Sequence, residues 1–105
     1  MSTTGELIQA DDTYEGFIAD LAFDADIRLV PNQRKTEEKH PDFIVNGKSP
    51  RGREIEVGAA WKKVSQADAD YLSLSINIGG KKMNVNAVPA KKGDMSELRI
   101  IPYAN

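Results

Sequence analysis

The sequence contains no cysteine and only one histidine, His40. Without cysteine the chain can form no disulfide, no thiolate metal site and no thiol nucleophile. It has no run of 18 apolar residues, and its first segment is acidic and polar, so we expect neither a transmembrane helix nor a signal peptide. With 105 residues, of which 29% are charged and 40% hydrophobic, we expect one small cytoplasmic domain over residues 1–105.

Lysine and arginine are absent from the first 26 residues, which carry seven carboxylates. The rest of the chain holds 14 basic and nine acidic side chains, although the net charge is only −2. Such a division is typical of a protein with one acidic and one basic face. Two ordinary solvated surfaces would give the same count, so both interpretations stay open.

Helical periodicity is also missing, and apolar residues recur instead at every second position, as in strands. Over residues 53–63 the apolar side chains Ile55, Val57, Ala59 and Trp61 share one face. A second strand carries Leu72, Leu74, Ile76 and Ile78 on one face, and a third spans residues 82–88. Gly79-Gly80 predicts a tight hairpin turn between the second and third strands.

Shorter strands are expected at 5–8, 14–21, 27–30, 42–45 and 98–103. Asn46-Gly47 predicts a turn after the fourth of these, extended by a basic loop over residues 48–52. The sequence therefore predicts an all-β domain, a small antiparallel barrel or sandwich of about seven to eight short strands. A barrel has the advantage that closure removes exposed sheet edges, and both architectures stay open.

Four segments resemble a known family. They are Tyr14-Glu-Gly-Phe-Ile, His40-Pro-Asp-Phe-Ile-Val45, Glu56-Val-Gly-Ala-Ala-Trp-Lys-Lys63 and Tyr71-Leu-Ser-Leu74. In this order, over residues 5–90, they resemble the short bacterial proteins of domain-of-unknown-function family 736. The resemblance implies a protein of plasmids and conjugative elements in alphaproteobacteria. The family has no assigned activity that could be transferred to this chain.

The chain departs from that family's pattern at two places. Residues 46–52 form a longer, basic insertion, and residues 77–82 replace a more acidic segment. Both changes make the chain locally more basic.

No constellation of catalytic residues can be assembled from the sequence. His40 lies in a charged loop without a positioned partner, and no serine has a nucleophile context. The aspartates lack the spacing of a calcium loop, and Gly79-Gly80-Lys81-Lys82 lacks that of a phosphate-binding loop. We therefore expect no enzymatic activity, no metal and no cofactor.

A binding surface is the remaining candidate. Basic side chains around an aromatic platform suit single-stranded nucleic acid. In consecutive antiparallel strands, Lys62, Lys63 and Tyr71 should lie at one end of the sheet. The remaining basic candidates, which precede the first of these strands or begin the third, should lie at the opposite end. Trp61, Phe17 and Phe43 are expected in the core. The candidate residues are Lys48, Arg51, Arg53, Lys62, Lys63, Tyr71, Lys81 and Lys82.

Two functions follow from these patterns. The first is a non-enzymatic accessory protein of a mobile element that binds single-stranded nucleic acid through basic loops and a sheet face. The second is a protein-binding module, such as an inhibitor of host defence or a homodimer formed by sheet edges. The net charge of −2 and the isoelectric point near 5.4 favour the second, because nucleic-acid binders are usually basic.

Overall fold

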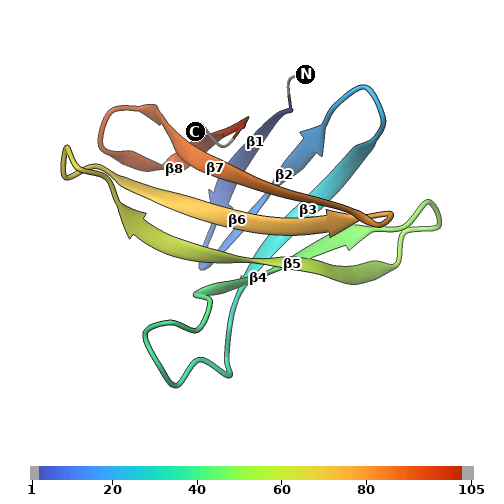
Figure 1. The fold of residues 1–105 in the computed structure, drawn as a ribbon, viewed down its shortest axis with the longest axis horizontal. Helices are drawn as coiled ribbons and strands as arrows, with labels where there is room; N and C mark the ends of the chain where they lie inside the picture. The colour runs from blue at the N-terminus through green and yellow to red at the C-terminus, as the bar shows by residue number, and fades with distance from the viewer. Residues whose placement is uncertain (1–2, 103–105) are drawn as a thin grey trace.

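A computed structural model describes residues 3–102 of the chain. Eight antiparallel strands follow one another around a closed barrel, and β8 pairs with β1 to complete it (Figure 1). The strands are β1 Thr4–Ala10, β2 Thr13–Ala19, β3 Asp24–Pro31, β4 Phe43–Lys48, β5 Glu54–Val64, β6 Asp70–Ile78, β7 Lys81–Lys91 and β8 Asp94–Pro102. The predicted all-β class and strand number are confirmed, and the barrel is the correct one of the two architectures.

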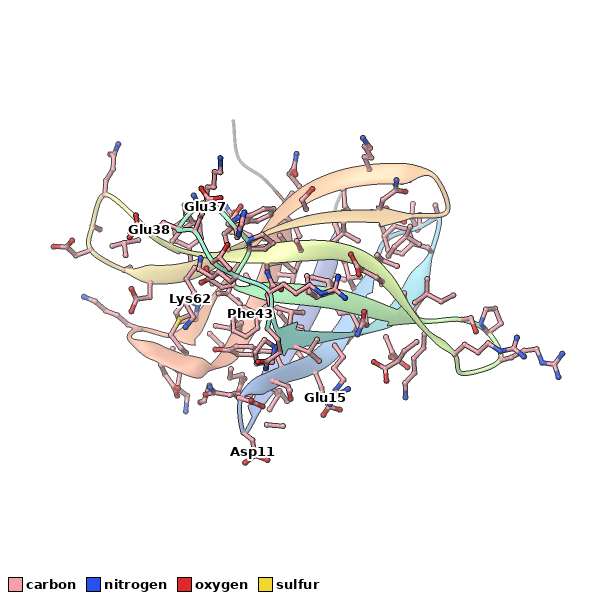
Figure 2. The ribbon with its side chains drawn as sticks, turned by 90° about the horizontal axis from the view of Figure 1, so that it is seen from below. Asp11, Glu15, Glu37, Glu38, Phe43 and Lys62 are labelled. Atoms are coloured by element: carbon pink, nitrogen blue, oxygen red, sulfur yellow. The ribbon has the colours of Figure 1, made fainter. Side chains whose placement is uncertain are left out.

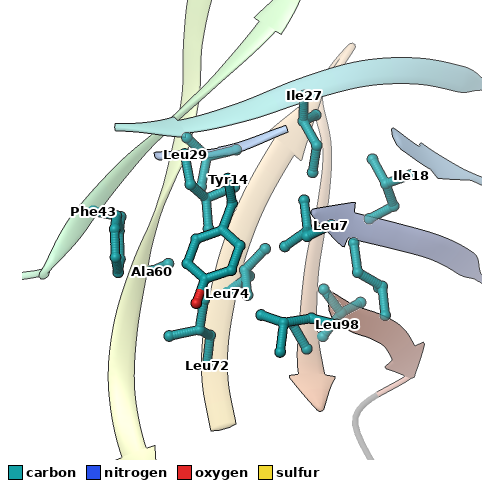
Figure 3. Close-up of a cluster of buried hydrophobic side chains, with 14 of the residues drawn as sticks. Leu7, Tyr14, Ile18, Ile27, Leu29, Phe43, Ala60, Leu72, Leu74 and Leu98 are labelled. Atoms are coloured by element: carbon teal, nitrogen blue, oxygen red, sulfur yellow. The ribbon is translucent and has the colours of Figure 1, made fainter. Parts of the chain in front are cut away.

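Apolar side chains at every second position of the strands fill the barrel interior, because alternate side chains of each strand point inward. Leu72, Leu74 and Ile76 of β6 are buried as predicted, and Val85 and Ala87 of β7 face them. Figure 3 shows the aromatic part of this core, where Tyr14 lies beside Phe43 with ring centroids 5.8 Å apart in an edge-to-face contact. The predicted burial of Phe43 is thus confirmed.

Trp61 was predicted in the core, and this is wrong because β5 contains a bulge. The register between β4 and β5 shifts at Val57, where Val45 pairs with Gly58 but Asn46 pairs with Glu56. One extra residue reverses the facing of the rest of the strand. Ala60 is consequently buried, whereas Trp61 lies on the outer face, half-buried and opposite Ser73.

Two other local predictions are also wrong. Phe17 pairs with Glu6 and Asp26 and shares their outward direction, while its neighbour Ile18 is buried. Asn46-Gly47 does not form a turn but continues β4, and the chain reverses at residues 49–53, where Gly52 has a φ of 82°. By contrast, Gly79 and Gly80 have φ values of 59° and 84°, which confirms the predicted two-residue hairpin.

The connections alternate between the two ends of the barrel, as they must when each strand reverses the chain. Turns 11–12, 32–42, 65–69 and 92–93 lie at one end, which we call the mouth end. Turns 20–23, 49–53 and 79–80 lie at the other, which we call the base end. The long β3–β4 connection hangs below the barrel in Figure 1.

Candidate binding face and barrel mouth

The eight candidate binding residues do not form one patch. Lys62, Lys63 and Tyr71 lie at the mouth end, where they line one cavity. The other five lie at the base end, on or beside its turns. This division follows from the alternating connections, as the sequence predicted.

At the base end, two basic turns border a hollow of 370 Å³. Lys48, Ser49 and Pro50 line it on one side and Ile78 and Gly79 on the other. Arg51 and Arg53 extend from the first turn into solvent. The two basic segments predicted from the sequence are therefore neighbours here.

Lys81 is already engaged within the fold. Its ammonium donates to Oδ2 of Asp20 at 2.7 Å and lies 5.6 Å from the ring centre of Phe23. The hydrogen bond from Lys81 is the largest cause of a lowered pKa for the Asp20 carboxyl, which also accepts from the N–H groups of Ala22 and Phe23. Lys81 therefore anchors the β2–β3 turn, whereas Lys82 stays exposed.

The outer face of β5, β6 and β7 carries no acidic side chain from Ala59 to Lys63, from Tyr71 to Asn77, or from Lys82 to Val88. We call this surface the β5–β7 face. Its outward side chains are aligned by the strand register, which pairs Lys63 with Tyr71 and Asn77 with Lys82. Small polar side chains fill the space between these pairs: Ser73, Ser75, Asn84 and Asn86. The face thus combines half-buried aromatic rings, hydrogen-bonding groups and a lysine at each end.

The β3–β4 connection packs against one margin of this face and holds Trp61 in place. The indole Nε1 donates to the carbonyl oxygen of Lys39 at 2.9 Å. Asp42 accepts the backbone N–H of Lys62 at 2.8 Å and pairs with Lys35 at 3.2 Å. Lys35 also donates to the carbonyl oxygens of Glu38 and His40, so the connection is internally bound.

The opposite outer face, on β1 to β3, is acidic. Its outward carboxylates are Glu6, Glu15, Asp24 and Asp26. Arg28 of β3 lies 3.6 Å from Glu54 of β5, with β4 between the two strands. Lys48 lines a groove of 430 Å³ together with Glu15, Asp26 and Glu54. The acidic first segment of the sequence therefore forms a separate face, and Lys48 belongs to it as much as to the base end.

The mouth end contains a cavity of 680 Å³. Its floor is made by the buried side chains of Tyr14, Phe43 and Leu72. Burial raises the pKa of the Tyr14 hydroxyl, which donates to the carbonyl oxygen of Met95 at 2.8 Å. Lys62 points inward over this floor, with its ammonium 5.8 Å from the centre of the Phe43 ring (Figure 2).

The single histidine and the carboxylates form no metal-binding group in the part of the chain that the structure describes. His40 contacts only its own loop, through Thr36 at 3.3 Å and Glu37 at 3.5 Å. No group of three or more metal-ligating side chains gathers anywhere in residues 3–102. The same residues include no helix long and apolar enough to cross a membrane.

Sequence reasoning missed two parts of this arrangement. The outward placement of Trp61 depends on a bulge that no pattern in the strand revealed. The absence of acidic residues on the β5–β7 face was visible, since residues 57–93 contain only two, Asp68 and Asp70. That signal would also have pointed to Ser73, Ser75, Asn84 and Asn86.

The fold and its surfaces define a class: a small up-and-down antiparallel barrel with one acidic and one acid-free outer face. Within that class, the chain belongs to the DUF736 family of proteins of unknown function, which matches residues 3–100. The resemblance seen in the sequence is thereby confirmed. Comparison with curated proteins and with solved structures finds no match.

Proposed function

We propose that the protein binds single-stranded nucleic acid on the β5–β7 face and has no enzymatic activity. The observation that carries this proposal is the acid-free surface bearing Trp61 and Tyr71 between Lys63 and Lys82. The sequence resemblance supports a role as an accessory protein of a mobile element, and the composition supports a place in the cytoplasm.

The chemistry of the face supports a single strand. Unpaired bases stack on aromatic rings, and lysines neutralise the phosphates between them. Ser73, Ser75 and Asn84 offer hydrogen-bonding groups to base edges. Within residues 3–102 the face has no helix to enter a major groove, which favours unpaired bases over a duplex that is read by a helix.

The net charge of −2 does not oppose this proposal, because the carboxylates of the first strands lie on the other face. An acidic back and an acid-free front would orient a polyanion toward the β5–β7 face.

The test is fluorescence anisotropy with a labelled single-stranded DNA of about 12 nucleotides. The double variant Lys63→Ala/Lys82→Ala should bind more weakly, and the slope of log K against log salt should flatten by roughly 1.4. Tyr71→Ala should lower the affinity roughly 5- to 150-fold by removing one stacking platform, whereas Tyr71→Phe should bind like the wild type.

The matched control is Lys48→Ala/Lys92→Ala, which changes the net charge equally but leaves the β5–β7 face intact. Equal weakening by the two double variants would show that overall charge, not this face, binds the strand. Absence of binding at low salt, or tighter binding of a duplex of the same sequence, would also refute the proposal.

The acidic face supports a second candidate, a module that binds a basic protein. Ile8 is 56% exposed, and the register places it between Glu15 and Glu97. A half-exposed apolar side chain between two carboxylates suits a basic partner with an apolar anchor. The sheet-edge homodimer is less favoured, because each of the eight strands in residues 3–102 pairs on both sides. Failure of every oligonucleotide to bind would leave this candidate as the stronger one.

A further inference from the structure

The mouth cavity and the β5–β7 face share two residues. Lys63 and Tyr71 project from the outer face, and both also line the cavity of 680 Å³. A strand lying on the face and passing Tyr71 therefore reaches the cavity rim. A volume of this size falls within the range of small-molecule sites, roughly 300–1,000 Å³.

The interior of the cavity is apolar and aromatic. Phe43 and Leu72 form its floor with Tyr14, whose hydroxyl is already bonded to Met95. On the wall, Val64 is 61% exposed although it is apolar. Such a lining favours the flat face of a ring over a strongly hydrated group.

The rim, by contrast, carries charges of both signs. Asp11, Asp12 and Asp70 line the cavity with Lys62 and Lys63, and none of these five forms an ion pair in the described residues. The fourth lining carboxylate, Asp42, is paired with Lys35. A strongly anionic ligand would be repelled by the carboxylates, and a cationic one by the lysines. An uncharged group with several hydrogen-bond donors meets neither penalty, because carboxylates accept from hydroxyl and amino groups.

We propose that the mouth cavity receives the terminal nucleoside of the bound strand, an inference that rests on the proposed function. The base would lie over Phe43 in the place that the Lys62 ammonium takes in the free protein. A sugar hydroxyl would donate to a rim carboxylate, and the displaced Lys62 would hold the first phosphate together with Lys63. A phosphate on the terminal hydroxyl itself would approach the three aspartates and weaken binding.

The test is competition against the labelled strand by three unlabelled DNAs of one sequence. They are a linear strand with hydroxyls at both ends, the same strand with phosphates at both ends, and the circular form. The hydroxyl-ended strand should compete at least about tenfold better than the other two, because only it can place a neutral end in the cavity.

Val64→Glu places a carboxylate on the cavity wall and should abolish this preference. Ile8→Glu is its matched control, since it adds the same charge at a similarly exposed apolar residue on the acidic side. That variant should keep the preference. Because the readout is a ratio between DNAs, a general loss of affinity through added charge cancels.

Equal competition by linear and circular DNA, or a preference for phosphate ends, would overturn this inference and leave the proposed function standing. An unchanged preference in Val64→Glu would also overturn it. Failure of all three DNAs to bind would refute the proposed function as well.

Discussion

Asp42 fastens the long β3–β4 connection to β5 with a few contacts. It accepts the backbone N–H of Lys62 and pairs with Lys35. The indole N–H of Trp61 donates to the carbonyl oxygen of Lys39, three residues before Asp42. Burial by itself would raise the pKa of Asp42. The hydrogen bonds from Lys62 and Lys35 outweigh burial and hold the pKa below its ordinary value of 3.8. The connection is thus docked by a carboxylate that must stay charged.

The docking should therefore depend on pH. Because the folded pKa of Asp42 lies below the unfolded one, its contribution is complete above about pH 3.8 and is lost as the pH falls through the folded pKa. Trp61 is the single tryptophan, so its emission reports the change directly. In wild type, acid should shift that emission to the red. Asp42→Asn should show the shifted emission already at neutral pH.

Asp94→Asn serves as the control for this titration. Asp94 also has a lowered pKa, caused first by its hydrogen bond from Ser96, but it lies in the β7–β8 hairpin. Its variant should keep the acid transition of Trp61. Identical emission of Asp42→Asn and wild type at every pH would contradict the assigned role of Asp42.

At the scale of elements, glycine lets the backbones of neighbouring strands approach closely at Gly16 and Gly58. A Cβ built on Gly58 would lie 2.0 Å from the carbonyl oxygen of Ser75, and one on Gly16 would lie 1.7 Å from that of Glu6. Gly58 follows the bulge at Val57 directly, so the two features together turn β5 around the barrel. The extra residue of the bulge also places Trp61 on the outer face.

Gly58→Ala should destabilise the protein by about 3 kcal/mol or more, because the clash involves backbone that cannot move away cheaply. Gly52→Ala is the matched comparison. Gly52 has a φ of 82° but open space around it, so alanine there should cost only about 1–2 kcal/mol. Urea unfolding of both variants measures the difference. A smaller loss for Gly58→Ala than for Gly52→Ala would contradict the close approach.

At the scale of the whole molecule, the pairing of β1 with β8 completes the barrel. Leu7 and Leu98 pair directly across this contact, and both are fully buried. Strands β1 and β8, which lie far apart in the sequence, thus share one core. Closure also separates the two charged surfaces, since β1–β3 and β5–β7 lie on different sides of one cylinder.

Leu7→Ala and Leu98→Ala should each lower the free energy of unfolding by about 2–5 kcal/mol, because each leaves a cavity in a closed core. The two losses should not add, since the side chains are in contact. Ile8→Ala, at the exposed neighbour, should cost less than about 1 kcal/mol. Chemical denaturation of the wild type, the two single variants and the double variant gives the free energies for a double-mutant cycle. Strictly additive losses would show that the β1–β8 contact is not a packed part of the core.

Much of this architecture could be predicted from local pattern. Alternation in β6 and β7 and the Gly79-Gly80 hairpin gave correct strands, faces and turn, because each depends on neighbours in sequence. The predicted separation of Lys62, Lys63 and Tyr71 from the other basic residues also followed from alternating connections alone. The directions of Trp61 and Phe17 could not be predicted in this way, because partner strands set them.

The sequence by itself determined the strand class, the order of the turns and the separation of acidic from basic segments, since these depend on periodicity and composition. Only the tertiary structure decided that the sheet closes, that a bulge turns Trp61 outward, and that Lys62 points into the mouth. It also decided that Lys63 and Tyr71 belong to the β5–β7 face and the mouth cavity at once. The physical reason is that register and curvature arise from pairing between strands.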